Sequence, residues 1–291
     1  MPRRVALLVN PSAGRGRSGR LLPAVLARLG ADGHDVLVRP TASLEHGDEL
    51  VASALQDDRV VVALGGDGLV GRVAGGVAAG GGLLAALPGG RGSDFARAAG
   101  LGRDPVAACA VLTDGVETRI DLGDVDGRAF LCIASVGFDS VVQEIALATR
   151  LPLGAAVYPY AALRAALTWR AAGFSGSVDG ATFTMSGWAV AAANSGVYGG
   201  GMRLAPDASV VDGLLDVVTT SATPRLRFVR GLARVYRGTH VALPNVRVQR
   251  ARTVHLAADR PFVVFADGDP IGTLPCTISV RPAALRVLLP A

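Results

Sequence analysis

The first third of the chain alternates short, mostly apolar runs with stretches of helical spacing. The apolar runs stand at residues 4–10, 35–41, 59–66 and 82–90. The pattern between them predicts helices over about 19–30, 44–56 and 70–79, and a further helix after Ser93. Strands without polar alternation that are separated by helices predict a parallel sheet covered on both faces.

The pattern changes near Arg119. From there most segments alternate apolar and polar residues, with turn signals such as Asp126-Gly127 between them, which is typical of an antiparallel sandwich or barrel. Two helical stretches interrupt the strands, one over about 139–169 that Pro152 and Pro159 break, and one over about 224–236. We therefore divide the chain into three parts: an α/β domain of residues 1–122, a β-rich domain of residues 123–273, and a last strand within 274–291 that returns to the first domain.

Composition narrows the function classes. The formal charge is +5, and all 29 basic residues are arginine, so lysine-dependent chemistry is excluded. Aromatic residues make up only 5%, and no stretch interleaves them with arginines, so we expect no nucleic-acid partner. The three scattered cysteines favour a reducing, cytoplasmic setting. The uncharged stretch 73–90 is too rich in glycine for a membrane span.

Three predicted strands of the first domain end in glycine-rich turns. They are the turns at 10–14, 65–68 and 88–94. In a parallel sheet the carboxyl ends of the strands share one edge, where ligands bind. Glycine lets the backbone approach a phosphate closely, and helix N-termini favour anions. One such turn is equally well explained as a tight turn, but three with acidic residues beside them predict a nucleotide site.

The order of these motifs resembles the superfamily of diacylglycerol kinases and sphingosine kinases. NP-x-x-G, GGDG and PGG-x-x-x-DFAR come first, and matching segments follow at 119–123, 134–139, 204–218 and 265–272. The resemblance implies an ATP- and Mg²⁺-dependent lipid kinase with a Rossmann-like nucleotide domain and an antiparallel β-sandwich lipid domain. It also implies a lipid acceptor, most of all diacylglycerol or a relative, at the inner membrane face. Whether the protein forms a homodimer stays open.

The resemblance also assigns roles by matched motif. The nucleotide site would comprise Asn10, Pro11, Gly14, Thr41, Gly65, Gly66, Asp67, Gly68, Gly90 and Arg91. Asp121 would join Asp67 around the catalytic Mg²⁺, and Asp267 or Asp269 would be the base near the acceptor hydroxyl. A second, structural metal would be held by Asp212, Ser209 and Leu214.

Some positions depart from the family pattern or allow a plainer explanation. Residues 69–72 lack the usual threonine and acid after GGDG, and Arg91 replaces a hydroxyl. These departures keep open a catalytically weak lipid- or nucleotide-binding member of the same fold. An NAD kinase-like enzyme is a second alternative, because such enzymes share the GGDG motif. We interpret Asp94 as a helix N-cap, the arginines at 227–237 as a solvated helix face, and the apolar segment 151–163 as core or as a cover for the acceptor.

Overall fold

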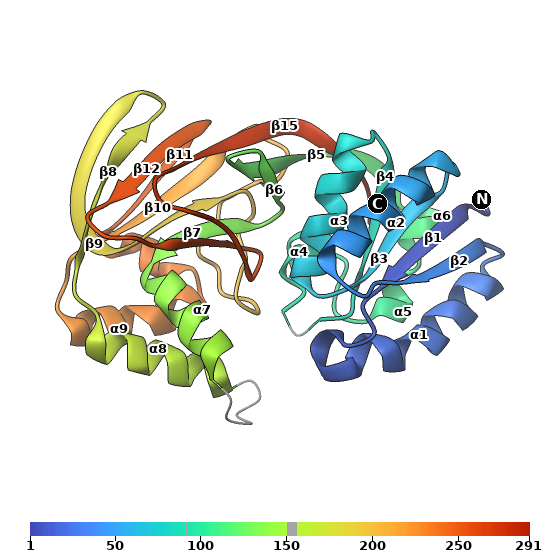
Figure 1. Cartoon of the computed structure of the whole chain (residues 1–291), viewed down its shortest axis with the longest axis horizontal. Helices are drawn as coiled ribbons and strands as arrows, with labels where there is room; N and C mark the ends of the chain where they lie inside the picture. Colours follow the sequence, from blue (N-terminus) through green and yellow to red (C-terminus); the bar gives the residue numbers. More distant parts are fainter. Residues whose placement is uncertain (91, 150–155) are drawn as a thin grey trace.

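The computed structural model describes residues 1–90, 92–149 and 156–291. The chain forms two lobes that share a continuous network of paired strands (Figure 1). We call the part with β1–β4 and α1–α6 the first lobe, and the part with β6–β14 and α7–α9 the second lobe.

The first lobe is built on a parallel sheet in the order β2-β1-β3-β4. Leu7 of β1 stands between Val38 of β2 and Val62 of β3. On the sheet, α2 packs against α3 and α1 packs against α5, which explains why β1, β3 and β4 are almost entirely buried. The elements are β1 (Arg4–Val9), α1 (Ala13–Ala31), β2 (Asp35–Pro40), α2 (Leu44–Gln56), β3 (Val60–Gly65), α3 (Asp67–Ala79), β4 (Leu83–Pro88), α4 (Asp94–Ala98), α5 (Pro105–Ala108) and α6 (Val111–Asp114).

The second lobe is antiparallel. Its strands follow the order β14-β13-β7-β9-β8-β12, and β10 pairs with both β9 and β11. The three helices α7, α8 and α9 lie together along one side of this lobe (Figure 1). The elements are β6 (Arg128–Phe130), β7 (Ile133–Gly137), α7 (Phe138–Ala148), α8 (Val157–Thr168), β8 (Ala172–Val178), β9 (Ala181–Ala193), β10 (Leu215–Ser221), α9 (Arg225–Val235), the 3-10 turn η2 (Thr239–Ala242), β11 (Val246–Ala251), β12 (Thr253–Ala258), β13 (Val263–Ala266) and β14 (Asp269–Thr273).

Two long strands run between the lobes. β15 (Cys276–Leu289) pairs with β12 in the second lobe and, near its end, in parallel with β4, where Arg286 stands beside Leu83. β5 (Val116–Val125) is its antiparallel partner along most of this path. The register between them shifts from Arg281 to Leu285, and Ala283 in that bulge has a φ of 49°. The two sheets are thus joined by backbone hydrogen bonds.

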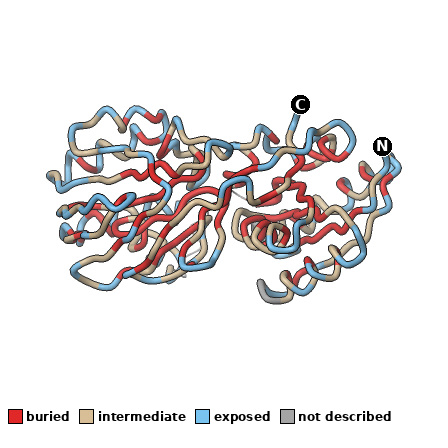
Figure 2. Tube along the Cα trace, turned by 90° about the horizontal axis from the view of Figure 1, so that it is seen from above, coloured by how far each residue is buried: buried red, intermediate tan, exposed pale blue. Residues whose placement is uncertain are grey.

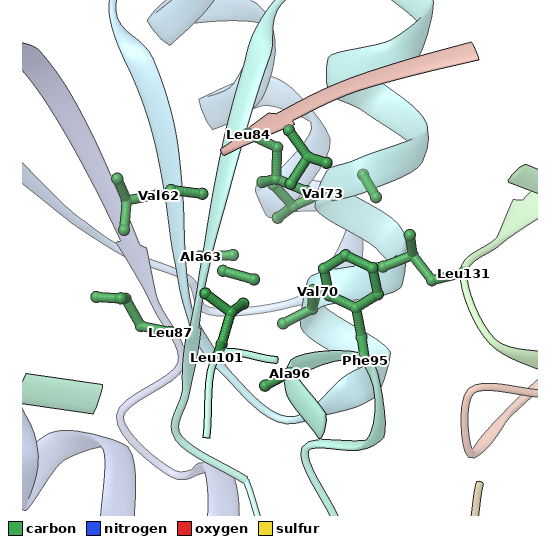
Figure 3. Close-up of a cluster of buried hydrophobic side chains, with 14 of the residues drawn as sticks. Val62, Ala63, Val70, Val73, Leu84, Leu87, Phe95, Ala96, Leu101 and Leu131 are labelled. Atoms are coloured by element: carbon green, nitrogen blue, oxygen red, sulfur yellow. The ribbon is translucent and has the colours of Figure 1, made fainter. Parts of the chain in front are cut away.

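Each lobe has its own apolar core, and the buried segments run through the middle of both (Figure 2). The first core also takes in residues from the second lobe. Figure 3 shows Leu131, which directly follows β6, beside Phe95 of α4 and Val70 of α3. This packing fixes the start of β7 against the first lobe.

The structure corrects several local predictions. α1 begins at Ala13 and α3 at Asp67, earlier than predicted, because glycines at a helix start resemble a loop in sequence. Pro159 does not break a helix. It lies in the first turn of α8, where its missing N–H has no helical partner to lose. Pro152 lies outside the described residues.

A second correction concerns the apolar segment 151–163. Its part from 156 onward is only partly core, because Ala161 is buried whereas Tyr158, Tyr160 and Leu163 are exposed. Within the described ranges, no helix is both long and apolar enough to cross a bilayer.

Candidate active site

The turns after β3 and β4 are in direct backbone contact. Gly89 and Gly90 both donate their N–H to the Gly65 carbonyl at 2.8 Å. A Cβ on Gly90 would stand 2.4 Å from the Gly66 Cα. These glycines are therefore required by the approach of two strand ends, whatever ligand binds there.

The other predicted nucleotide residues lie along the same edge. Arg17 Nη1 of α1 donates to the Gly90 carbonyl at 2.8 Å, and Thr41 N donates to the Val9 carbonyl at 2.8 Å. The Asn10 side chain accepts from Ser12 N at 3.0 Å and so shapes the turn after β1. Pro11 follows in that turn, and Gly14 lies in the first turn of α1. Arg91 falls outside the described part of the chain.

Asp67 is the first residue of α3 and is tied to the next turn. Its Oδ1 accepts from Asp94 N at 2.6 Å and from Phe95 N at 3.2 Å. Burial, with the neighbouring Asp94 charge, raises the pKa of Asp67 to about 6. The carboxyl also lies at the N-terminus of α3, where the helix dipole favours its charged form.

The prediction that Asp94 caps the following helix is wrong, because Asp94 is the first residue of α4. Ser93 occupies the N-cap position, and both oxygens of Asp94 accept from Gly200 N of the second lobe, at 2.9 and 3.0 Å. Burial raises the pKa of Asp94. The Gly200 loop is held in turn by Tyr198, whose hydroxyl donates to Asp139 at 3.4 Å. Asp94 therefore links the lobes beside Asp67.

Asp267 and Asp269 reach the same place from the β13–β14 turn. Asp267 accepts from Leu131 N at 2.7 Å and from Cys132 N at 2.9 Å. A Cβ on Gly71 would stand 2.8 Å from Asp267 Oδ2, and one on Gly68 would stand 2.0 Å from Asp269 Oδ2. Both carboxyls thus lie against the first two turns of α3.

The environment of these two acids disfavours their charge. Burial, and to a lesser degree the charge of Asp67, raises the pKa of Asp267 to about 7, although its backbone hydrogen bonds act in the opposite sense. Burial also raises the pKa of Asp269. Carboxyls with raised pKa values that converge in a cleft are typical of sites that bind cations or move protons.

Asp121 makes a different set of contacts. Its two carboxylate oxygens accept from Gly213 N and Ala283 N, each at 2.7 Å, and its N–H donates to the Val210 carbonyl. Among the described residues none of its hydrogen bonds is with Asp67. Asp121 thus braces the loop that carries the predicted metal ligands, and its place at the catalytic Mg²⁺ stays a prediction.

The predicted metal loop is ordered by its own side chains. Asp212 Oδ1 accepts from Leu214 N at 3.1 Å, and the Ser209 hydroxyl accepts from Val211 N at 3.4 Å. The described residues contain no group of three or more His, Cys, Asp or Glu side chains placed to hold a metal. A site here would rely on one carboxylate with hydroxyl and carbonyl oxygens.

The departures after GGDG have structural reasons. Leu69 is buried and packs onto Gly65, where a Cβ would stand 2.6 Å from its side chain. Gly71 makes room for Asp267, and Arg72 forms a bidentate ion pair with Asp48 of α2. Arg72, Arg128 and Arg281 line a cleft of about 350 Å³ between α3 and the second lobe, together with Asp267 and Asp269.

Comparison with known proteins agrees with this geometry. Residues 4–125 match the model of the diacylglycerol kinase catalytic domain, and residues 132–289 match the YegS C-terminal NAD kinase beta sandwich-like domain. A diacylglycerol kinase of Mycobacterium tuberculosis (strain ATCC 25618 / H37Rv) is 34% identical over 296 residues, covering 99% of this chain and 95% of the relative. The chain belongs to the diacylglycerol kinase family of lipid kinases.

A further relative supports the membership, and a solved structure supports the fold. A protein of Pseudomonas aeruginosa PAO1 named "Probable lipid kinase YegS-like" is 37% identical over 268 residues, covering 89% of this chain and 86% of the relative. A crystal structure of a diacylglycerol kinase from Bacillus anthracis str. Sterne superposes with a TM-score of 0.75 at 20% identity, covering 99% of this chain and 97% of that one. The predicted fold class, an α/β lobe with an antiparallel β-sandwich, is confirmed. Use of ATP follows from membership of this kinase family.

Sequence reasoning missed three contributors to the candidate site, Asp94, Leu131 and Gly200. All three act through tertiary contacts. Leu131 N donates to Asp267, and Gly200 N donates to Asp94, which thereby links the two lobes. The run Gly199-Gly200-Gly201 is a visible signal in the sequence, because consecutive glycines are typical of a turn, and in the structure all three have positive φ. Nothing in the sequence shows that its partner is Asp94.

Proposed function

We propose that this chain transfers the γ-phosphoryl group of ATP to the primary hydroxyl of diacylglycerol or a closely related lipid. The observation that carries the proposal is the convergence of Asp67 and Asp94 from the first lobe with Asp267 and Asp269 from the second at the N-terminus of α3. Phosphoryl transfer needs positioning and charge neutralisation more than covalent chemistry. A site closed from two lobes supplies the positioning.

The nucleotide would lie along the edge where the strands of the first lobe end. The turns at Asn10–Gly14 and Gly65–Gly68 bring the N-termini of α1 and α3 to this edge, where they would meet phosphates, and Thr41 and Gly90 would line the site beside them. Arg17 supplies a cation on this edge, where lysine serves in many other kinases. Its bond to Gly90 holds the turn after β4 in place.

We assign the base to Asp269 and a positioning role to Asp267. Both oxygens of Asp267 already accept backbone N–H groups. Within the described ranges the carboxyl of Asp269 accepts no hydrogen bond, so its oxygens are free to accept the proton of the attacking hydroxyl. Asp269 also lies against Gly68, within one helical turn of Asp67.

Mg²⁺ fits the site at Asp67. Protein-bound Mg²⁺ takes oxygen ligands, often one or two carboxylates completed by substrate phosphates and water. Asp94 N and Phe95 N both donate to Oδ1 of Asp67, so Oδ2, with the Asp94 carboxyl beside it, is the oxygen that would meet the ion. When bound, the ion would neutralise charge on the transferring phosphoryl group. Asp212, with Ser209 and Leu214, would hold a second, structural ion.

The acceptor would be met at a membrane surface. Its headgroup hydroxyl has to reach Asp269, and the cleft lined by Arg72, Arg128 and Arg281 opens beside that residue. The lipid kinase relatives favour this reading over an NAD kinase-like enzyme. The converged carboxyls weigh against a member that only binds, since binding alone does not need four acids placed together against their own charge.

The test is transfer of labelled phosphate from ATP and Mg²⁺ to lipid acceptors in detergent micelles, with NAD⁺ included. We expect an organic-soluble product with the wild type and with Asp114→Ala, an exposed control on α6. Asp67→Ala should abolish it. Label on NAD⁺ would instead establish the NAD kinase-like alternative, and ATP binding without transfer to any acceptor would establish the binding protein.

A further inference from the structure

Exposed apolar side chains gather on the helical side of the second lobe. Among the described residues, twelve large apolar side chains are exposed, and eight of them belong to α7, α8, α9 or the residue that ends α9. α8 packs against both α7 and α9, so these side chains share one region (Figure 1). Apolar side chains that are scattered singly over a surface are normal, but their concentration on one face indicates a binding partner.

The residues of α8 are distributed opposite to those of an ordinary surface helix. Its buried positions are the alanines 161, 165 and 166. Its outer face carries Tyr160, Leu163 and Leu167, which are 36%, 59% and 67% exposed. Their spacing of three and four residues puts them on one face. In a surface helix of a globular protein the apolar stripe faces the core, so α8 offers its larger apolar side to something outside the chain.

The outer side of α9 adds a basic row to this apolar face. Leu226, Val229 and Tyr236 are exposed, and Arg227, Arg230 and Arg234 each lie one or two positions from them in sequence. Phe228 and Val235 are buried and anchor the helix to the lobe. Within the described ranges, none of these three arginines forms an ion pair.

No acidic residue stands in α8, in α9 or in the segments that flank them. The sequence has no Asp or Glu between Glu144 and Asp179, and none between Asp216 and Asp259. The face that consists of the outer sides of α8 and α9, which we call the α8–α9 face, is therefore both apolar and basic. That combination matches an anionic lipid surface, where arginines bind phosphates and apolar side chains enter the boundary of the acyl chains.

We propose that the α8–α9 face docks this chain on anionic membranes. The inference rests on the proposed function, because it names the surface from which the kinase reaches a lipid acceptor. A second copy of the chain is a poorer occupant, since a two-fold contact would bring the same arginine rows against each other. α7 connects the face to the site: it packs on α8, and its Asp139 accepts from Tyr198 in the loop that binds Asp94.

Vesicle sedimentation without ATP tests docking separately from catalysis. Vesicles of phosphatidylcholine with phosphatidylglycerol would be compared with vesicles of phosphatidylcholine alone. We expect binding to the anionic vesicles that weakens with salt. Arg230→Gln with Arg234→Gln should lower the affinity about 25-fold, from roughly fivefold for each arginine. Leu163→Ser with Leu167→Ser should lower it at least about tenfold.

The matched control is Arg119→Gln with Arg252→Gln, which removes the same charge from exposed positions elsewhere. It should bind almost as the wild type does. Equal losses in the control and in the α9 variant, or wild-type binding by both face variants, would overturn the proposal. So would a wild-type dimer in sedimentation equilibrium that the face variants convert to monomers without loss of vesicle binding.

Catalysis in detergent micelles separates the proposed kinase function from the proposed docking surface. Both face variants should phosphorylate a micellar acceptor at the wild-type rate while losing activity on vesicles. If the wild type is inactive on every acceptor yet still binds vesicles through this face, the proposed function fails and the docking surface stands. Failure of the face variants to lose vesicle binding overturns docking alone.

Discussion

Replacing Asp267 by Asn should change how stability depends on pH. The folded chain holds the Asp267 proton up to a pH of about 7, whereas an unfolded Asp releases it near pH ~3.9. Between these values the folded state binds more protons, so the free energy of unfolding falls as pH rises. For this one carboxyl the loss between pH 5 and pH 8 is about 3 kcal/mol, from ~1.4 kcal/mol per pKa unit.

The Asn variant keeps one acceptor and cannot receive both N–H groups of Leu131 and Cys132. Leaving one of them unpaired costs about 1–3 kcal/mol. That cost does not vary with pH, so it offsets the whole curve without changing its slope. The difference between wild type and Asp267→Asn should therefore move in favour of the variant by about 3 kcal/mol from pH 5 to pH 8.

Urea unfolding at a series of pH values measures this difference. Asp179→Asn is the matched control, because Asp179 also accepts two backbone N–H groups but lies in an exposed turn. A difference between wild type and Asp267→Asn that stays constant within about 1 kcal/mol over this range would refute the argument that burial raises the Asp267 pKa.

Three further predictions concern the site and its supports. Asp269→Asn should lower kcat in the micelle assay by about 10²–10⁴ with little change in KM for ATP, and a kcat within threefold of wild type (about 0.7 kcal/mol of barrier) would remove Asp269 from the role of base. Gly90→Ala would place a Cβ 2.4 Å from the Gly66 backbone, so it should lower the free energy of unfolding by about 1–3 kcal/mol and raise KM for ATP. Gly30→Ala is its control, because nothing lies within 4 Å of the added Cβ. Equal thermal shifts in the two variants would contradict the reasoning. Asp121→Asn should cost about 1–3 kcal/mol in urea unfolding, since Asn cannot accept from both Gly213 and Ala283; an unchanged midpoint would show that those bonds do not support the loop.

The fold class was readable from the sequence because periodicity reports burial directly. Fully apolar runs separated by helical spacing correctly predicted the parallel sheet of the first lobe, and α2 occupies the predicted 44–56. Helix starts were less predictable. Glycines at the N-termini of α1 and α3 are compatible with both a turn and a helix. Only the packed structure decides where the turn ends and the helix begins.

The sequence by itself determined which chemistry this protein carries: glycine-rich strand ends, spaced acids and a chain without lysine. Only the tertiary structure decided which acids meet. Asp67 and Asp94 are 27 positions apart, yet they share the site with Asp267 and Asp269 from the far end of the chain, because Leu131 and Gly200 place the second lobe against α3 and α4. Contacts between side chains and backbone groups so distant in sequence leave no local pattern. The outward face of α8 has the same origin, since burial of its alanines depends on the neighbouring helices and strands.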